Sequence, residues 1–467
     1  MTRSLDPEEE ELVDKSEDFS DGEDHTESSK LIKINSLNTR EWLKFGVRSL
    51  ARQCKIVDDS EKAGLLPSMF NIINANLGTG ILAMPFVVRL SGYWGILTII
   101  VIGILGNYTG KKLISLLYEY AEDGTRVRVR DTYVDIGEAF WPGYGKYLVH
   151  VANFFEQFSH CALLLIMPGT VIAHVFPKTE LSERTWIFFL SLTILPTAFL
   201  RKMHQISWLS VVTVMTAAVI SVFVLCYSLT HHTHWSDDVM PDFDIRLIPI
   251  GIGIVVVTYS SQAYMPAIER SMRDPEIFDP LMDFAYTLVA VFKFGIGVIV
   301  FLAFTNQSDQ IMTLNLPHNI FGGIVNIAVI IMSLTFYTVP MFTIFDIMEN
   351  QLKIPCLEPL QDYETKIAGI PHLSPNLLFR IGLVSSTIAI ACSVPHFSLM
   401  MAFVGSLTGM LLGFIYPSLF YIKIRWNELT NTSVVFNLCI IMFACLSGAF
   451  GIMFSAKALY SVYNEYD

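Results

Sequence analysis

Long apolar stretches dominate this chain of 467 residues and leave few folds open to it. A helix needs about 17 to 25 predominantly apolar residues to cross the hydrocarbon core of a bilayer. Eleven stretches of the chain meet that requirement: residues 65–90, 93–117, 144–176, 184–200, 205–229, 246–271, 281–304, 319–350, 375–393, 396–424 and 433–459. Because backbone amides in lipid must be hydrogen-bonded within the chain, these stretches predict an all-α multi-pass membrane protein with about 11 transmembrane helices.

The charged residues are few and unevenly placed. They make up 16% of the chain, against about 25% in a soluble domain, which excludes an ordinary soluble fold. The formal net charge is −12, and residues 1–30 account for −9 of it through twelve acidic and three basic side chains. A segment so acidic is expected to be disordered and solvated. The predicted organisation is a disordered acidic tail over residues 1–63, a transmembrane domain over residues 64–460 and a short tail over residues 461–467.

Lysine and arginine concentrate in alternate loops, which sets the predicted orientation. The basic loops include Arg126, Arg128, Arg130, Arg201, Lys202, Arg270, Arg273, Lys423 and Arg425. Such loops stay in the cytosol, so we expect a cytoplasmic N-terminus and, after an odd number of spans, a lumenal C-terminus. The glycosylation sequon at Asn306 falls in a loop on the lumenal side, in agreement with this orientation.

Two of the apolar stretches contain polar and small residues at their centres. The first span carries Asn74, Asn76, Leu77, Gly78, Thr79 and Gly80, and the sixth carries Tyr259, Ser260, Ser261 and Gln262. Interrupted helices five spans apart are typical of transporters built as a five-plus-five inverted repeat, with the substrate bound at the breaks. Unwound backbone there suits the carboxylate and the ammonium of an amino acid. The alternative is that Gly78 and Gly80 only allow close helix packing.

Three of the ionisable side chains inside predicted spans are candidates for a functional role, because charge inside a membrane is costly and usually functional. Glu156 lies beside a polar stripe on the third span, Glu269 follows the break in the sixth, and Lys293 lies in the middle of the seventh. We expect Glu156 and Glu269 to be the carboxyls linked to proton movement, with Lys293 tuning one of them. A pairing of Glu269 with Lys293 is expected because either charge alone would be poorly solvated. The alternative for Glu156 is a structural hydrogen bond.

Several motifs resemble those of the vesicular inhibitory amino acid transporters, a branch of the amino acid/auxin permease family. The matching segments are residues 107–114, 117–119, 122–124, 126–134, 248–254, 259–262, 266–269, 315–317, 405–409 and 417–420, together with Lys293. The resemblance covers nearly all of the chain after about residue 64. It implies a five-plus-five inverted-repeat core with an eleventh helix, and it places Glu156, Glu269 and Lys293 at matching positions. Residues 74–80 instead resemble the proton- or sodium-coupled symporters of the wider family.

The resemblance implies loading of GABA and glycine into acidic synaptic vesicles by exchange for lumenal protons. The driving force would be the proton gradient and membrane potential made by a separate pump. Ser406 and Thr408 of the tenth span are then expected near the substrate. The partners implied are a small amino acid, protons and the lipid bilayer.

The residue motifs also bear on other functions, of which some are excluded and two remain as alternatives. The chain has no phosphate-binding loop and no zinc motif, so we expect no enzymatic activity, no cofactor, no metal and no nucleic-acid partner. The alternatives within reach are a lysosomal or plasma-membrane amino acid symporter and an amino acid sensor that does not transport.

The acidic tail ends in a sorting pattern. Glu27, followed at the fourth and fifth positions by Leu31 and Ile32, matches the acidic dileucine signal that clathrin adaptors bind in cytoplasmic tails. The predicted topology places this signal on the cytosolic side, so we expect delivery to vesicular or endosomal membranes.

Overall fold

The computed structural model describes residues 64–121, 125–199, 203–230, 240–241, 244–348 and 375–465. These residues belong to one compact unit, Ala63–Asp467. The predicted acidic tail, with Glu27, Leu31 and Ile32, lies outside the described residues, as do the last two residues of the chain.

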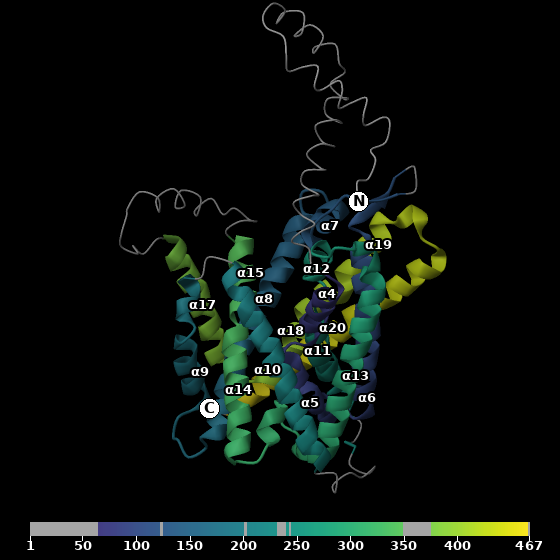
Figure 1. The fold of residues 1–467 in the computed structure, drawn as a ribbon. Helices are drawn as coiled ribbons and strands as arrows, with labels where there is room; N and C mark the ends of the chain where they lie inside the picture. Colours follow the sequence, from purple (N-terminus) through teal and green to yellow (C-terminus); the bar gives the residue numbers. More distant parts are fainter. Residues whose placement is uncertain are drawn as a thin grey trace, which may run out of the picture. The chain divides into compact units, whose positions relative to one another are not determined.

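Helices make up most of the described chain (Figure 1). The α-helices are α4 (Leu65–Leu77), α5 (Met84–Ser91), α6 (Tyr93–Ser115), α7 (Tyr133–Phe140), α8 (Gly145–Val175), α9 (Glu183–Leu192), α10 (Met203–Thr230), α11 (Ile248–Tyr259), α12 (Met265–Arg270), α13 (Phe278–Phe304), α14 (Ile320–Phe336), α15 (Thr338–Asp346), α17 (Pro375–Ser393), α18 (Phe397–Val404), α19 (Tyr416–Ile424) and α20 (Asn431–Glu465). Short 3₁₀ segments are η1 (Thr79–Ala83), η2 (Leu195–Phe199), η5 (Pro275–Ile277), η6 (Thr305–Gln307), η7 (Met312–Asn315) and η11 (Trp426–Glu428), while η9 (Gly405–Gly409) and η10 (Leu411–Ile415) are π-helical.

Six helical stretches of the described chain are long and apolar enough to cross a membrane. They are Tyr93–Ser115, Gly145–Val175, Pro275–Gln307, Ile320–Asp346, Phe397–Ile424 and Asn431–Val462. A seventh forms if the bent pair Leu65–Leu77 and Thr79–Ser91 counts as one span. The protein is therefore an all-α multi-pass membrane protein, and the fold class predicted from its apolar stretches is confirmed at that level.

The first predicted helix break is real and is made by one glycine. α4 ends at Leu77, and Gly78 takes a φ of +43° while its N–H donates to the Asn74 carbonyl at 3.2 Å. Side chains with a Cβ rarely adopt such a φ, whereas glycine does so at little cost. The chain resumes at Thr79 as η1 and α5, at an angle of 41° to α4.

The second break separates α11 from α12. α11 ends at Tyr259, residues 260–264 are not helical, and α12 starts at Met265 with Pro266 in its first turn. Proline has no N–H to donate and its φ suits a helix start, so Pro266 favours a new helix here. α11 packs against η1, and α12 packs against α4. The two breaks therefore lie side by side, and α4 and α12 lie toward the same end of the bundle (Figure 1).

A hairpin and a short helix, not predicted from the sequence, connect α6 to α8. Strands β1 (Tyr118–Tyr120) and β2 (Arg126–Arg128) pair antiparallel, with Tyr118 opposite Arg128. α7 then begins with a capping box, in which Thr132 and Asp135 each accept a hydrogen bond from the other's backbone N–H. α7 packs against α8 and α19, so this connection closes over the end of the bundle at which α12 lies.

Small residues bring α11 close to the tenth predicted span. α11 packs along α18 and η9, and a Cβ added to Gly253 would overlap the Ser406 hydroxyl and the Ala402 carbonyl. The glycine at that contact allows the two backbones to approach. The apolar core continues across this contact and contains Val256, Phe414 and Phe420.

Candidate functional site

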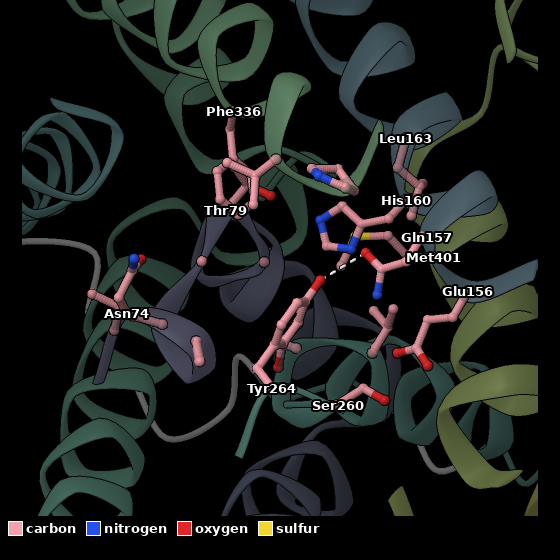
Figure 2. A pocket seen from close by; sticks show the side chains of 18 of the residues that line it. Asn74, Thr79, Glu156, Gln157, His160, Leu163, Ser260, Tyr264, Phe336 and Met401 are labelled. Carbon is pink, nitrogen blue, oxygen red and sulfur yellow. Dashed lines mark hydrogen bonds between the residues drawn. The ribbon is translucent and has the colours of Figure 1, made fainter. Parts of the chain in front are cut away.

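A cavity of about 360 Å³ lies where the two broken helices meet. It is lined by Asn71, Asn74, Ala75, Leu77, Gly78, Thr79, Gly80, Glu156, Gln157, His160, Leu163, Val257, Thr258, Ser260, Tyr264, Ile268, Phe336, Val339, Pro340, Phe397 and Met401. Figure 2 shows these side chains converging from α4, α8, the second break and α18. The volume falls in the range of small-molecule sites, which starts at about 300 Å³.

The first break supplies one wall of the cavity. Thr79 begins a half-helix, and the first N–H groups of a helix have no partner within it. Those groups, together with the positive end of the helix dipole, favour an anion such as a carboxylate. Gly80 packs against the side chain of Thr258, and a Cβ at Gly80 would lie 2.8 Å from the Thr258 Cβ. Glycine at this position therefore lets the two broken helices touch.

α8 supplies the polar wall through Glu156, Gln157 and His160. The Tyr264 hydroxyl donates to Gln157 Oε1 at 2.7 Å, so the second break is joined to α8 across the cavity (Figure 2). The Gln157 Nε2 atom donates in turn to Asn153 Oδ1 at 3.2 Å. This chain of hydrogen bonds holds the Gln157 amide in one orientation.

Glu156 is the acidic group of the cavity, and its side chain is only 4% exposed. Its Oε2 atom forms no hydrogen bond of ordinary geometry among the described residues, and the Ser260 hydroxyl, which lies beside the carboxyl, forms none either. Both groups lie on the same side of the cavity (Figure 2). A buried acceptor without a partner is costly, so this pair is suited to receive a donor that enters the cavity, such as an ammonium group or a proton.

Apolar side chains make up much of the remaining lining. Phe336 and Pro340 come from the junction of α14 and α15, and Phe397 and Met401 come from α18. No lysine or arginine lines the cavity in the described part of the chain. The site therefore combines one carboxyl, several neutral polar groups and an apolar wall, which suits a small molecule that carries an ammonium group.

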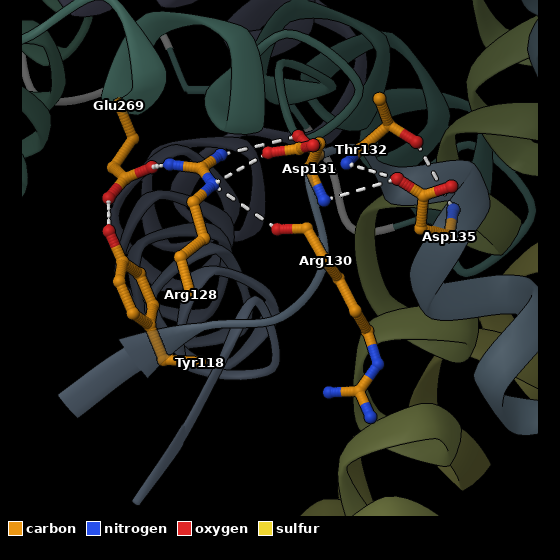
Figure 3. Close-up of polar contacts among 7 residues, drawn as sticks. All are labelled: Tyr118, Arg128, Arg130, Asp131, Thr132, Asp135 and Glu269. Carbon is orange, nitrogen blue, oxygen red and sulfur yellow. Dashed lines mark hydrogen bonds and ion pairs between the residues drawn. The ribbon is translucent and has the colours of Figure 1, made fainter. Parts of the chain in front are cut away.

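Glu269 lies outside this cavity, in an ion pair with the hairpin. It is completely buried in α12, and its carboxylate accepts from the Arg128 guanidinium and from the Tyr118 hydroxyl (Figure 3). The predicted pairing of Glu269 with Lys293 is therefore wrong. The loop that follows α6 folds back as a hairpin and delivers Arg128 to Glu269, a contact that spacing along the chain does not indicate.

Burial and the Glu269 carboxylate also change the chemistry of Tyr118. This tyrosine lies in β1, outside the spans. Desolvation, followed by the hydrogen bond and the negative charge of Glu269, raises the pKa of Tyr118 to about 12. Its phenol therefore keeps its proton and remains a donor to Glu269 over the physiological pH range.

Lys293 is buried against the end of α11 instead. Its Nζ atom donates to the Thr258 carbonyl at 2.7 Å and contacts the Thr258 hydroxyl at 2.9 Å. It also lies 3.6 Å from the centre of the Tyr259 ring. Lys293 does not line the cavity, but Thr258, to which it is bonded, does.

Comparison with known proteins identifies the family of the chain. The family model described as transmembrane amino acid transporter protein matches residues 61–457, which is most of the chain. The chain belongs to the transmembrane amino acid transporter family. It is therefore an amino acid transporter and not an enzyme, as predicted.

Named relatives refine the comparison. A vesicular inhibitory amino acid transporter of Xenopus laevis is 32% identical over 418 residues, covering 88% of this transporter and 80% of the relative. A vesicular GABA transporter of Caenorhabditis elegans is 28% identical over 410 residues, covering 87% and 82%. Among solved structures, the nucleobase-cation-symport-1 family transporter Mhp1, closed with bromovinylhydantoin bound, matches with a TM-score of 0.48 and 11% identity, covering 86% of this chain and 92% of that one.

Some residues predicted to bind substrate join the two breaks in this amino acid transporter and do not line its cavity. The Asn76 side-chain Nδ2 atom donates to the Ile72 backbone carbonyl at 2.9 Å, and the Asn76 side-chain Oδ1 atom accepts from the Ser261 hydroxyl at 2.9 Å. Ser261 also lies 2.9 Å from the Tyr286 hydroxyl of α13. These contacts connect α4, the second break and α13 behind the cavity.

The remaining predicted residues pack elsewhere in the bundle. Tyr259 stacks on Tyr286 with 6.2 Å between ring centres. Gln262 donates weakly to the Gly106 carbonyl of α6 at 3.5 Å. Thr408 donates to the Val404 carbonyl at 3.1 Å, and Ser406 is buried where α11 approaches α20. None of the four lines the cavity.

Some residues that line the cavity were not predicted from the sequence. Gln157 and His160 were visible in the polar stripe of the third span, and Tyr264 lies five residues after Tyr259, but none was predicted to bind substrate. Phe336 and Phe397 could not be predicted, because an aromatic residue in an apolar span cannot be distinguished from a residue of the hydrophobic core. The predicted glycosylation residue Asn306 is exposed, in η6.

Proposed function

We propose that this transporter exchanges lumenal protons for cytosolic GABA or glycine in acidic vesicles by alternating access. The observation that carries the proposal is the unpartnered Glu156 oxygen in a cavity at the junction of two broken helices. We also propose the finer architecture, a five-plus-five inverted repeat of ten helices with an eleventh. The two side-by-side breaks support it, because paired interrupted helices mark such repeats.

The cavity supports a zwitterionic substrate. The half-helix that starts at Thr79 suits the carboxylate, and Glu156 with Ser260 suits the ammonium group. An acidic amino acid would bring a second negative charge near Glu156 with no lysine or arginine in the described lining to neutralise it. The printed names of the two relatives, an inhibitory amino acid transporter and a GABA transporter, support GABA and glycine as the first substrates to test.

Glu156 is the proposed proton carrier. A carboxyl that faces both the substrate and changing hydration can take a proton from an acidic lumen and exchange it for the substrate ammonium. Intramembrane carboxyls in transporters commonly relay protons. Glu269 is already held by Arg128 and Tyr118, so its part in proton movement would first require that contact to open.

The test is uptake of labelled GABA, glycine and other neutral amino acids into proteoliposomes that contain the purified full-length protein. We expect accumulation when the interior is acidic and electrically positive, and its loss when both gradients are collapsed. Glu156→Gln should lose gradient-driven uptake, and Glu119→Gln, which changes a carboxyl that is 52% exposed, should not. Accumulation that survives collapse of both gradients would rule out proton exchange.

The same experiment separates the alternatives. Uptake only when the exterior is acidic would identify a proton symporter, a possibility favoured by the resemblance of residues 74–80 to symporters. Uptake that requires a sodium gradient would identify a sodium symporter. Substrate binding without flux would identify a sensor.

The vesicular location is proposed on the acidic dileucine pattern of Glu27, Leu31 and Ile32. Replacing Leu31 and Ile32 together by alanine should move the protein to the cell surface without changing reconstituted uptake. The measurement is surface biotinylation compared with immunofluorescence of acidic compartments. An unchanged distribution would remove the signal from the proposal.

A further inference from the structure

Lys293 is a buried basic side chain whose position neither the cavity lining nor the pairing of Glu269 explains. Its side chain is 0% exposed, near the middle of α13. No described carboxylate forms an ion pair with it, whereas Thr258 provides two oxygen atoms within 2.9 Å and Tyr259 provides its ring face. A buried ammonium is stable only when protein groups replace the water molecules that would otherwise surround it. The Thr258 carbonyl, the Thr258 hydroxyl and the Tyr259 ring are the groups that do so here.

The position of those groups shows what the ammonium replaces. α11 ends at Tyr259, and the last carbonyls of a helix have no partner within it and carry the negative end of the helix dipole. The Thr258 carbonyl is one of them. At interrupted helices in transporters, such half-helix C-terminal ends coordinate a sodium ion or a proton. Carbonyl oxygen, hydroxyl oxygen and an aromatic face are all ligands of a small cation.

We propose that Lys293 is a resident cation of the transport site, whose ammonium occupies the position at the broken end of α11 that a bound metal cation would otherwise fill. The inference rests on the proposed transport function. Its consequence is that substrate binding needs no sodium or potassium ion. Lys293 is a positioning residue: it holds Thr258, and Thr258 both lines the cavity and packs against Gly80 of the first break.

The test measures equilibrium binding of labelled GABA and of labelled glycine to purified full-length protein, without gradients, in choline, sodium or ethylammonium chloride. Wild-type binding should be the same in all three salts. Lys293→Ala removes the ammonium and leaves space, so binding should fall roughly a hundredfold in choline, the order expected when charged hydrogen bonds are lost. Sodium or ethylammonium should restore much of it, because either cation fits the space left.

Two further variants separate a missing cation from a packing defect. Lys293→Met is uncharged but fills the space, so its binding should fall as far and should not be restored by either cation. Thr258→Val removes the hydroxyl oxygen and keeps the carbonyl, so it should lose only a few-fold.

Several results would overturn the proposal. They are wild-type binding that falls more than tenfold when choline replaces sodium, wild-type affinity in Lys293→Met, and equal rescue of the alanine and methionine variants. If Lys293→Ala fails to fold, gel filtration in detergent will show it. In that case the effect of sodium on wild-type binding and the affinity of Lys293→Met still test the proposal. Because binding is measured without gradients, a failure of proton exchange leaves this test unaffected.

Discussion

Glu156 of α8 and Glu269 of α12 are two buried carboxyls close to the second helix break, and their surroundings differ. Glu269 is held by the Arg128 guanidinium and the Tyr118 hydroxyl, both from the hairpin. Glu156 has an oxygen without a partner and faces the cavity. A carboxylate satisfied by fixed donors holds elements together, whereas an unsatisfied one beside a cavity is free to meet a ligand. Burial alone does not distinguish these two roles.

The hairpin that holds Glu269 is itself tied to the end of the bundle. Arg425, which follows α19, donates to the Tyr118 carbonyl at 2.5 Å, and Arg130 donates to the Leu116 carbonyl at 2.8 Å. The Arg128–Glu269 contact therefore joins α12 to a strap anchored at α6 and α19. Movement of α12 away from this end would require the ion pair to break, while Glu156 would stay with α8.

The largest effect on transport is expected from Glu156→Gln, which removes the carboxyl that faces the cavity. Loss of an interaction with a charged partner costs up to about 3 kcal/mol, or roughly a hundredfold in affinity. Gradient-driven uptake should fall by that order while the melting temperature in detergent stays within a few degrees. If Glu156→Gln loses uptake only because it unfolds, Glu156 has a structural role like that of Glu269.

The largest effect on stability is expected from Arg128→Met. It leaves the Glu269 carboxylate buried without its cation, and such a loss costs about 3–5 kcal/mol. The melting temperature should drop markedly, and adding Glu269→Gln should recover part of the loss, since the unpaired charge is then gone. Arg126→Met, which removes an exposed cation 3.8 Å from the Tyr118 ring, is the control and should cost about 0.5–1 kcal/mol. Equal effects of the two arginines would contradict the role given to Glu269.

A smaller effect is expected at alkaline pH from Tyr118. Its pKa is raised from 10 to about 12 in the folded protein. The folded protein therefore binds the phenol proton more tightly than the unfolded chain does. The stabilisation is complete below pH 10 and is lost as the pH rises toward 12. Melting temperatures measured from pH 8 to 12 should fall more steeply for the wild type than for Tyr118→Phe. Parallel curves would indicate that the phenol is not bonded to Glu269.

The smallest effect is expected from Tyr264→Phe, which removes the hydrogen bond to Gln157 across the cavity. A neutral hydrogen bond contributes about 1 kcal/mol, so substrate affinity should fall a few-fold and stability should change little. Tyr144→Phe, at a tyrosine 67% exposed, is the matched control. If stability falls and affinity does not, the Tyr264–Gln157 contact only holds the helices together.

Much of the architecture could be predicted because hydropathy and backbone propensity are local. The apolar stretches predicted the helices, and the polar and small residues at positions 74–80 and 259–262 predicted where two of them break. Polar residues inside apolar spans drew attention to Glu156, which does line the cavity. The hairpin was missed because its strands are only three residues long and lie in a charged loop with no strand pattern.

The partners of the buried charges could not be predicted. Glu269 and Lys293 are 24 positions apart, and pairing them was the simplest way to neutralise both. Glu269 instead meets Arg128, 141 positions earlier, and Lys293 meets the Thr258 carbonyl. A backbone carbonyl exposed by a helix break leaves no trace in the residue types, so a search for opposite charges cannot find it.

The sequence by itself determined that this chain crosses a membrane, where two of its helices break and which side chains place charge inside it. Those properties depend on each residue's own transfer energy and backbone preference. Only the tertiary structure decided which carboxyl faces the cavity, which is held by the hairpin, and what surrounds the buried lysine. Those outcomes depend on contacts between segments far apart in the chain, whose geometry is set by how the helices pack.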